Sequence, residues 1–387
     1  MDSIFSGEGR SIGEFLRERW TEMGDGLGLS RSMTGPVTDQ VLDLLRPWAD
    51  IPVGRTCPFP SYVGSDGFPA EMSVKWSQGR PELRILFEAL GSSRPVTAAS
   101  NRVAAARLTD RLAGEPLVSL DRYGKVADVF APGAGEELTP IPVWHSLAWR
   151  PGHPPDFKLY FGLYTVAPQE RFALVTEAME RLGMGPAWAD TAAGVARGTA
   201  TDGVERELEF FALDLDSATK ARAKVYYRNH TSSVAVLEQM ASLARSHEPA
   251  RARSAFRTLL GTAPEAAGDA PLTCLAFRSD AAGADESSTY FRVSSITASD
   301  AEAAARIGAL MAHEGLDPQR HRALLRAVAP QPLNRIRGLQ ELVSYRSRGH
   351  EGDVSVYFRF PIYPPLTAQP SPLPRQARGI LQEVESL

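Results

Sequence analysis

Hydrophobic and polar residues alternate with a period of two in ten short segments, and these segments come in five pairs. A short connection rich in Gly, Pro or charged residues joins the two members of each pair, which is typical of a β-hairpin. The pairs are AEMSVKW and LRILFEAL (70–76, 83–90), VWHSLAW and FKLYFGLY (143–149, 157–164), RELEFFALDL and ARAKVYYRN (206–215, 221–229), PLTCLAFRSD and STYFRVSSI (271–280, 288–296), and LQELVSYRS and DVSVYFRF (339–347, 353–360).

Helical periodicity fills segments before and between these hairpins. The expected helices cover residues 11–23, 36–48, 96–113, 168–182, 231–246, 249–260, 299–314 and 317–328, with a further short helix at 374–385. In the second helix, Thr34 is the expected N-cap and Pro36 falls early in the helix. Five hairpins separated by helices predict ten mostly antiparallel strands, whereas single strands alternating with helices would predict a parallel sheet.

Ten strands in successive hairpins leave no free edge if the sheet curls and closes on itself. We therefore expect an α+β fold, a ten-stranded antiparallel β-barrel surrounded by helices, with the ligand site in the barrel lumen. One domain is expected over residues 1–387, with N-terminal helices in 1–50, the barrel and its outer helices in 57–360, and a Pro-rich C-terminal tail in 361–387. Helices outside the barrel would cover the apolar stripe of each strand, so the polar stripe would face the lumen.

That polar stripe combines cations with phenols on several strands. Its members include Lys158 and Tyr160; Arg222, Lys224 and Tyr226; Ser288, Tyr290 and Arg292; and Asp353, Ser355 and Tyr357. On an open sheet this face would simply be solvated, but desolvated cations inside a barrel need an anion. Two unit charges in contact attract by roughly 4 kcal/mol at an effective dielectric near 20, so a diphosphate offsets much of the cost. Because phenol faces stabilise a nearby cation, the combination suits ionisation of an allylic diphosphate.

One carboxyl group joins the stripe in the first predicted strand. Glu71 shares its face of the strand with Ser73 and Lys75. In the lumen, the Glu71 carboxylate would accept a proton from an aromatic substrate. On an outer surface, it would instead pair with Lys75 or Arg84.

Composition excludes several classes of function. The net charge is −4 over 387 residues and no long run of Lys and Arg occurs, so neither nucleic acid nor a membrane surface is an expected partner. Cys57 and Cys274 stand in separate contexts, which predicts neither a disulfide framework nor a cysteine metal site and fits a reducing compartment. The N-terminus lacks the pattern of a secretory signal and no apolar run is long enough to span a membrane, so a cytoplasmic protein is expected.

Motifs that bind metals are also missing from the sequence. No DDxxD-like pair that would hold Mg²⁺ on a diphosphate occurs. The acidic segment DLD at 214–216 falls at a predicted strand end, where we expect it to be solvated. No metal site is therefore predicted.

Six segments resemble, in order, those of the dimethylallyltryptophan synthase family of aromatic and indole prenyltransferases, in its bacterial form. They are SDGFPAEMSVKW, LRILFEALG, KLYFGLY, RAKVYY, STYFRV and LVSYRSRGHEGDVSVYF, and the resemblance runs from about residue 57 to 360. The family's fold is a ten-stranded antiparallel barrel of repeated ααββ units, the PT-barrel, which agrees with the pattern of hairpins and helices.

The resemblance implies transfer of a dimethylallyl group from dimethylallyl diphosphate to the indole ring of tryptophan or a tryptophan derivative, in secondary metabolism. It implies that no cofactor is required and that Mg²⁺ is not essential. A carbon of the benzene ring such as C6 is the expected position of prenylation, and the protein is expected to be a monomer or homodimer. Two alternatives stay open: a prenyltransferase for phenols or other aromatic acceptors, and a noncatalytic carrier of an anionic ligand.

The resemblance also implies roles for individual residues. Glu71 corresponds to the acceptor of the indole N–H proton. The position of a second proton acceptor falls at His145, for which a lone histidine in a strand is the alternative reading. The tyrosines that shield the allyl cation correspond to Tyr160, Tyr226, Tyr290 and Tyr357.

The cations that bind the diphosphate correspond to Arg84, Lys158, Arg222, Lys224 and Arg348. Three departures from the family pattern accompany this set. Ser288 stands where a Gln or Lys is frequent, and Arg292 is expected to replace it. Asp353 stands where the last strand has a second tyrosine, and Arg80 competes with Arg84 for its role.

Overall fold

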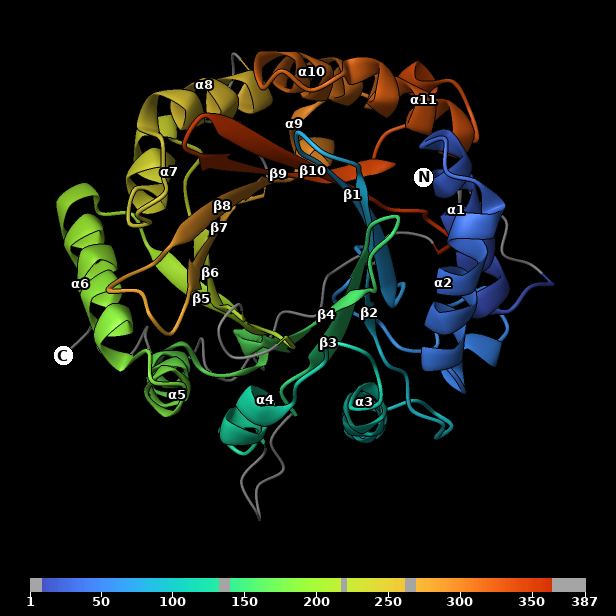
Figure 1. Cartoon of the computed structure of the whole chain (residues 1–387), viewed down its shortest axis with the longest axis horizontal. Helices are drawn as coiled ribbons and strands as arrows, with labels where there is room; N and C mark the ends of the chain where they lie inside the picture. The colour runs from blue at the N-terminus through green and yellow to red at the C-terminus, as the bar shows by residue number, and fades with distance from the viewer. Residues whose placement is uncertain (1–8, 132–139, 217–220, 262–268, 364–387) are drawn as a thin grey trace, which may run out of the picture.

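Ten strands form one closed barrel in the computed structural model, which describes residues 9–131, 140–216, 221–261 and 269–363. Every strand pairs antiparallel with its neighbours in sequence, and β1 also pairs with β10, so the sheet has no edge (Figure 1). The predicted fold class is confirmed. The strands are β1 Ala70–Trp76, β2 Glu82–Glu88, β3 Val143–Trp149, β4 Asp156–Gly162, β5 Arg206–Asp214, β6 Ala223–Asn229, β7 Leu272–Phe277, β8 Glu286–Phe291, β9 Gln340–Arg348 and β10 Glu351–Phe358.

None of the described helices has both the length and the apolar composition needed to cross a bilayer.

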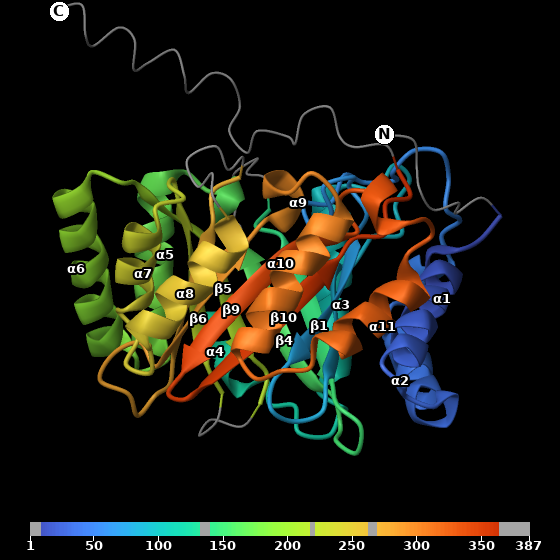
Figure 2. The same cartoon turned by 90° about the horizontal axis from the view of Figure 1, so that it is seen from above.

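Helices surround the barrel, and two of them precede each hairpin, which gives five successive ααββ units (Figures 1 and 2). The paired helices are α1 Ile12–Gly26 and α2 Arg31–Leu44, α3 Ala98–Leu112 and α4 Asp121–Val126, α5 Pro168–Arg181 and α6 Gly185–Asp202, α7 Val234–Ala241 and α8 Pro249–Leu260, and α10 Asp300–His313 and α11 Pro318–Val328. Shorter elements are α9 Val293–Ile296 and the 3₁₀ turns η1 Trp48–Asp50, η2 Leu163–Thr165 and η4 Leu333–Arg335.

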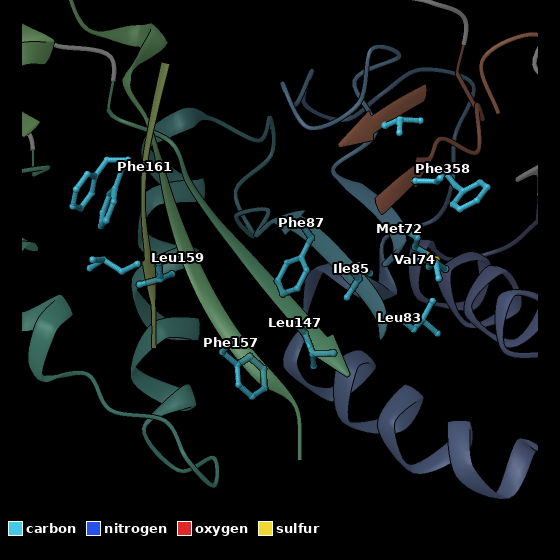
Figure 3. Packing of buried hydrophobic residues seen from close by; sticks show 14 of the residues in the cluster. Met72, Val74, Leu83, Ile85, Phe87, Leu147, Phe157, Leu159, Phe161 and Phe358 are labelled. Atoms are coloured by element: carbon cyan, nitrogen blue, oxygen red, sulfur yellow. The ribbon is translucent and has the colours of Figure 1, made fainter. Parts of the chain in front are cut away.

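The main hydrophobic core lies outside the barrel, between the sheet and the helices. Val74, Ile85 and Leu159 are fully buried there, and Figure 3 shows these side chains with others from β1 to β4 and β10. In antiparallel pairing, residues directly opposite each other point to the same side of the sheet. Because Ile85 stands opposite Met72 and Leu147, the apolar stripe continues from strand to strand. The lumen therefore receives the other stripe, as expected from the sequence.

Helix boundaries differ from prediction in several units; the helix expected at 231–246, for example, is limited to α7, Val234–Ala241. Helix α2 begins at Arg31, with Ser30 as its N-cap, so Pro36 lies inside the helix and removes one backbone hydrogen bond there. Helices α4 and α6 are not predicted from the sequence. The buried face of α6 consists of Ala187, Trp188, Thr191, Val195 and Gly198. Small and polar residues on that face hide the helical period from a hydrophobicity pattern.

The second strand of the fourth hairpin ends earlier than predicted. The expected strand runs to residue 296, but β8 ends at Phe291 and α9 takes up Val293–Ile296. Arg292, the N-cap of α9, leaves the extended conformation, and its side chain is held by two carboxylates. The helix expected at 374–385 lies outside the described residues.

Replacing Phe161 by Ala tests the outer core. The Phe161 side chain is fully buried, and its ring stacks on Phe130 with centroids 4.2 Å apart. We expect the change to lower the free energy of unfolding by about 3–5 kcal/mol in urea titrations. Val103→Ala, at a 51% exposed site on α3, serves as the control and should change stability by less than about 0.5 kcal/mol. Equal effects of the two changes would contradict an outer core.

Candidate active site

The lumenal residues of the five even-numbered strands form three successive levels, since alternate residues of a strand face the same side. The first level, next to the hairpin turns, is mostly acidic, the second is polar with three cations, and the third is aromatic. In order from β2 to β10, the first level is Glu82, Asp156, Arg222 (the residue just before β6), Glu286 and Asp353. The second level is Arg84, Lys158, Lys224, Ser288 and Ser355, and the third is Leu86, Tyr160, Tyr226, Tyr290 and Tyr357.

The tyrosines of the third level form a continuous row around the lumen. Ring centroids lie 6.0 Å apart from Tyr160 to Tyr226, 6.0 Å from Tyr226 to Tyr290, and 5.8 Å from Tyr290 to Tyr357. Burial raises the pKa of all four phenols, so they stay neutral hydrogen-bond donors. The row combines ring faces with neutral hydroxyl groups at one depth of the barrel.

The odd-numbered strands place small residues beside the second and third levels. Each of these small residues stands opposite one second-level and one third-level residue; Cys274, for example, faces Ser288 and Tyr226. The five small residues are Ser73, Ser146, Ala212, Cys274 and Ser344. Because these side chains are short, the lumen keeps open space between the lysines and the tyrosines.

A cavity of about 310 Å³ opens on the hairpin side of the tyrosine row, and we call it the cationic chamber. Its described lining residues include nine Lys and Arg against six Asp and Glu, an excess of three positive charges. The cations are Lys75, Arg84, Arg150, Lys158, Arg222, Lys224, Arg278, Arg346 and Arg348; the acids are Glu82, Asp156, Asp214, Asp216, Glu286 and Asp353. This excess favours an anion with several charges.

A belt of alternating charges runs along one wall of the cationic chamber. Asp214 accepts hydrogen bonds from Arg222 at 2.7 Å and Lys224 at 3.1 Å. Glu286 then bridges Arg222 at 2.8 Å and Arg346 at 2.6 Å. Asp353 continues the belt from Arg346 to Lys75, the latter at 3.1 Å. The expectation of a solvated DLD segment is thus wrong at Asp214, which is buried and ion-paired.

The carboxylates of the belt also balance lumenal cations, so the expectation that these cations need a bound anion is wrong for the paired ones. Burial on its own would raise the pKa of Glu286, but Arg346 and Arg222 lower that pKa to about 2. Lys224 and Arg222 likewise hold the pKa of Asp214 well below its usual range, against the effect of burial. These carboxylates are therefore ionised at neutral pH, and the unliganded chamber has counter-ions of its own.

Lys158 is the exception in the second level. Arg84 is paired with Glu82 at 2.5 Å and Lys224 with Asp214, whereas no carboxylate in the described part of the chain lies within 4.0 Å of the Lys158 ammonium. Burial and the neighbouring Lys224 lower the pKa of Lys158 to about 7. Near neutral pH, this side chain is poised between its charged and neutral forms.

A second cavity, of about 130 Å³, lies on the other side of the tyrosine row, and we call it the aromatic chamber. It shares the four tyrosines with the cationic chamber. Trp144 packs on Phe210 with centroids 5.0 Å apart, and Tyr62 stacks on Tyr164 at 4.3 Å. Flat aromatic walls of this kind suit a flat apolar ring as ligand.

Two β-bulges supply carboxylates to this end of the barrel. The register between β5 and β6 shifts at Glu209, and the register between β9 and β10 shifts at Glu341. A bulge inserts an extra residue and re-aims its side chain. Glu209 forms an ion pair with Arg228, and Glu341 forms one with Arg292. Both arginines of the aromatic chamber are thus already paired.

Glu71 lines the aromatic chamber and, among the described residues, has no ion-pair partner within 4.0 Å. Burial and the nearby Glu341 raise the pKa of Glu71 to about 8, although Arg292 opposes this effect. The alternative of a surface glutamate paired with Lys75 is wrong, because Lys75 pairs with Asp353 in the other chamber. A carboxyl group with a raised pKa in an apolar pocket is suited to exchange a proton with a bound ligand.

The structure brings most of the predicted site residues together. Arg84, Lys158, Arg222 and Lys224 line the cationic chamber, the four tyrosines separate the chambers, and Glu71 lies beyond them. Arg348 lies at the exposed rim of the cationic chamber. Arg80 does not line that chamber; it lines a smaller neighbouring pocket with Arg150 and His153.

His145 is not in the lumen, which contradicts its predicted place in the site. It stands opposite Phe87 and Leu159, two residues of the outward stripe. Its Nε2 is 2.9 Å from the Thr109 hydroxyl on α3, and its ring stacks on Phe87. Burial lowers the pKa of His145 to about 3, which keeps it neutral. It is a packed residue between barrel and helix, as in the alternative reading.

Arg292 reaches the lumen but at the wrong end for a diphosphate cation. It lines the aromatic chamber, where its guanidinium pairs with Glu341 and with Asp269, the latter at 2.7 Å. It therefore does not replace the cation missing at Ser288, which lines the cationic chamber. The error arose because the alternation of a strand gives the face of a residue but not its depth.

Lys75 and Arg346 are cationic-chamber residues that sequence reasoning left out. Both lie on lumenal faces: Lys75 alternates with Glu71 and Ser73, and Arg346 lies two residues before Arg348. The period-two pattern contained both signals. The aromatic walls formed by Tyr62, Trp144 and Phe210 had a weaker signal, since aromatic residues are equally common in cores.

A ten-stranded barrel with this divided lumen is the architecture of an aromatic prenyltransferase. The sequence model of tryptophan dimethylallyltransferase matches residues 37–324, and the chain belongs to this family. The predicted family membership and enzyme class are thus confirmed.

Several solved structures of dimethylallyltryptophan synthases are similar to this chain over nearly its whole length. A 6-dimethylallyltryptophan synthase from Micromonospora olivasterospora, in complex with DMASPP and Trp, superposes with a TM-score of 0.79 at 27% identity, covering 92% of this chain and 100% of that one. Another 6-dimethylallyl tryptophan synthase has a TM-score of 0.79 at 28% identity, with coverages of 94% and 99%. The 5-dimethylallyl tryptophan synthase from Streptomyces coelicolor, at 24% identity, shares the fold with a TM-score of 0.78 and coverages of 93% and 99%.

Replacing Asp353 by Asn tests the charge belt. The change removes the carboxylate that pairs with Lys75 and Arg346, so the cationic chamber gains one net positive charge. We expect inorganic diphosphate to bind roughly tenfold more tightly in calorimetric titrations. The free energy of unfolding should fall by about 1–3 kcal/mol, because two half-buried cations lose a partner. Asp280→Asn, exposed between β7 and β8, is the control. Weaker diphosphate binding to the Asp353 variant would contradict this electrostatic model.

Proposed function

We propose that this enzyme transfers a dimethylallyl group from dimethylallyl diphosphate to the indole ring of tryptophan or a tryptophan derivative, without a metal ion. The observation that carries the proposal is the tyrosine row, which separates a chamber with excess positive charge from an aromatic chamber containing an unpaired carboxyl group. The similar 6-dimethylallyltryptophan synthase from Micromonospora olivasterospora, in complex with DMASPP and Trp, supports this choice of substrates.

The diphosphate would occupy the cationic chamber. Arg84, Lys158 and Lys224 belong to the second level, next to the tyrosine row, and would contact the end of the diphosphate that bears the allyl group. Lys75, Arg222, Arg346 and Arg348 line the rest of the chamber and would hold the distal phosphate. Fixed cations stabilise the charge that develops on the leaving group, which is the part that Mg²⁺ plays in other diphosphate enzymes.

The allyl group would lie at the level of Tyr160, Tyr226, Tyr290 and Tyr357. Ring faces stabilise an adjacent cation by roughly 0.5–2 kcal/mol each. Four neighbouring rings also keep water from the cation, which would otherwise be captured as an alcohol. The open space left by the small residues of the odd-numbered strands gives the allyl group room between the lysines and these rings.

The indole ring would stack in the aromatic chamber, with its N–H directed to Glu71. An ionised Glu71 accepts this hydrogen bond and increases the electron density of the ring, which makes the ring carbon a better nucleophile. We propose C6 as the position of attack, supported by two similar 6-position enzymes at 27% and 28% identity. The atom that faces C1 of the allyl group decides this outcome.

Product analysis tests the proposal directly. With dimethylallyl diphosphate, tryptophan and EDTA, we expect a product heavier than tryptophan by one C₅H₈ unit, and NMR should place the new bond at C6. Prenylation of naphthalenediol or tyrosine but not of any indole would favour the phenolic alternative. Tight binding of dimethylallyl diphosphate without turnover on any aromatic acceptor would favour a noncatalytic carrier. Loss of activity in EDTA that Mg²⁺ restores would contradict the metal-independent mechanism.

The pH profile tests Glu71. Only the ionised carboxylate accepts the N–H hydrogen bond, and it predominates above the pKa of Glu71, about 8. At saturating dimethylallyl diphosphate, kcat/KM for tryptophan should therefore rise about tenfold per pH unit up to about pH 8 and then level off.

The matched variants are Glu71→Gln and, at an exposed site on α5, Glu180→Gln. Glu71→Gln should lower kcat/KM by about 10²-fold or more and abolish the rise with pH. Glu180→Gln should keep the wild-type profile. A Glu71→Gln enzyme with wild-type activity would remove Glu71 from the mechanism.

A further inference from the structure

We propose that Lys158 donates a proton to the diphosphate as it leaves, a role that rests on the proposed function and adds a general acid to it. Lys158 lies in the lumen next to the tyrosine row. Lys158 and Tyr160 are alternate residues on the lumenal face of β4, and both line the cationic chamber. If the allyl group lies among the tyrosines, the bond between its C1 and the diphosphate oxygen lies at the junction of the second and third levels. The second-level cations are the groups next to that bond.

Only one of the three second-level cations is suited to lose a proton. A guanidinium group keeps its proton at any physiological pH, which excludes Arg84. Burial and Arg222 lower the pKa of Lys224, but its ion pair with Asp214 at 3.1 Å favours the charged form, a partner that Lys158 lacks in the described part of the chain. Lys158 has no carboxylate within 4.0 Å among the described residues.

The surroundings of Lys158 explain its acidity. On the neighbouring strands, Ser146 of β3 and Asp214 of β5 stand opposite it. Lys224 of β6 and Arg84 of β2 add positive charge, while Asp214 and Glu82 oppose them. With burial as the largest cause, the balance lowers the pKa of Lys158 to about 7. In the free enzyme at about pH 8, most Lys158 side chains are therefore neutral.

The charge of the cationic chamber gives the substrate a reason to reprotonate Lys158. The excess of three positive charges among the described lining residues counts Lys158 as charged, and it falls to two when Lys158 is neutral. A fully ionised allylic diphosphate carries three negative charges, since the last ionisation of a phosphate ester occurs near pH 6. Binding of this trianion favours uptake of one proton by Lys158, which makes the filled chamber neutral.

Charge, electrons and the proton are all accounted for in the resulting ionisation step. The bond between C1 and the bridging oxygen breaks, and its electron pair stays with the diphosphate. The Lys158 ammonium transfers its proton to the departing diphosphate, so Lys158 is left neutral and the diphosphate leaves as a trianion. The allyl cation remains among the tyrosines. A positioned acid of this kind contributes typically 10²–10⁴-fold to a rate.

The activity test compares Lys158→Arg with Lys125→Arg, at an exposed site on α4. Arginine keeps the positive charge at position 158 but does not give up a proton. We expect Lys158→Arg to lower kcat about 10²-fold or more, with the Kd for dimethylallyl diphosphate changed less than about tenfold. Lys125→Arg should keep wild-type kcat. Wild-type kcat in a Lys158→Arg enzyme at about pH 8 would overturn the proposal.

The proton count gives a second readout that a purely structural effect would not change. Titrations with dimethylallyl diphosphate at about pH 8, in two buffers that differ in ionisation enthalpy, measure the protons taken up on binding. We expect about one proton for the wild-type enzyme and for the lumenal control Lys224→Arg, and none for Lys158→Arg. Equal uptake by the wild-type enzyme and the Lys158→Arg variant would overturn the proposal. If Lys158→Arg does not fold, absence of uptake by the wild-type enzyme overturns it.

These outcomes are separable from failure of the proposed function. A wild-type enzyme that neither binds dimethylallyl diphosphate nor prenylates an indole would contradict the proposed function itself. A wild-type enzyme that binds and turns over dimethylallyl diphosphate without proton uptake would contradict only the role of Lys158.

Discussion

The whole structure depends on the placement of charged side chains inside a barrel that water would otherwise fill. Buried cations are tolerated only where carboxylates or a ligand compensate for lost hydration. Here Asp214, Glu286 and Asp353 hold the cations of one wall in a belt of ion pairs. The belt fixes the positions of the cations before any anion arrives, so binding does not have to order them. Preorganisation of this kind is what makes electrostatic stabilisation of a leaving group effective.

The closed barrel makes this arrangement possible because it removes the need for a hydrophobic centre. The helices of the five ααββ units bury the outward stripe, in which Val74, Ile85 and Leu159 are fully buried. The lumen then receives the polar stripe without cost to the main core. Small residues on the odd-numbered strands keep part of the lumen empty, and the tyrosine row divides it. A charged compartment and an aromatic compartment thus lie within reach of one reacting group.

Titratable groups on the two sides of the tyrosine row have pKa values shifted in opposite directions. Burial raises the pKa of Glu71 and lowers the pKa of Lys158, so each is driven towards its neutral form in the empty site. We therefore expect ligand binding to be accompanied by proton exchange at both ends of the lumen. The carboxylates of the charge belt behave differently, since neighbouring cations keep them ionised. Environment alone separates the groups that exchange protons from those that hold charge.

The sequence by itself determined the hairpin repeat, the closed barrel and which residues of a strand share a face. A period of two is a local property, so Lys158, Tyr160, Lys224 and Tyr226 could be assigned to one face, and Lys75 and Arg346 carried the same signal. The tertiary structure decided how deep each residue lies in the lumen and which face of a strand points outward. The alternation puts Arg292 on the face of Tyr290, but Arg292 lines the aromatic chamber and not the cationic chamber. His145 lies on the outer face of β3.

The ion pairs and the bulges also required the tertiary structure. Asp214 meets Lys224 because β5 and β6 are adjacent in a particular register, which no single strand specifies. Glu209 and Glu341 enter the site through shifts of that register, and a period-two pattern has no place for an extra residue. Alternation along a strand is encoded between neighbours in the chain. Pairing across strands depends on how the whole barrel closes.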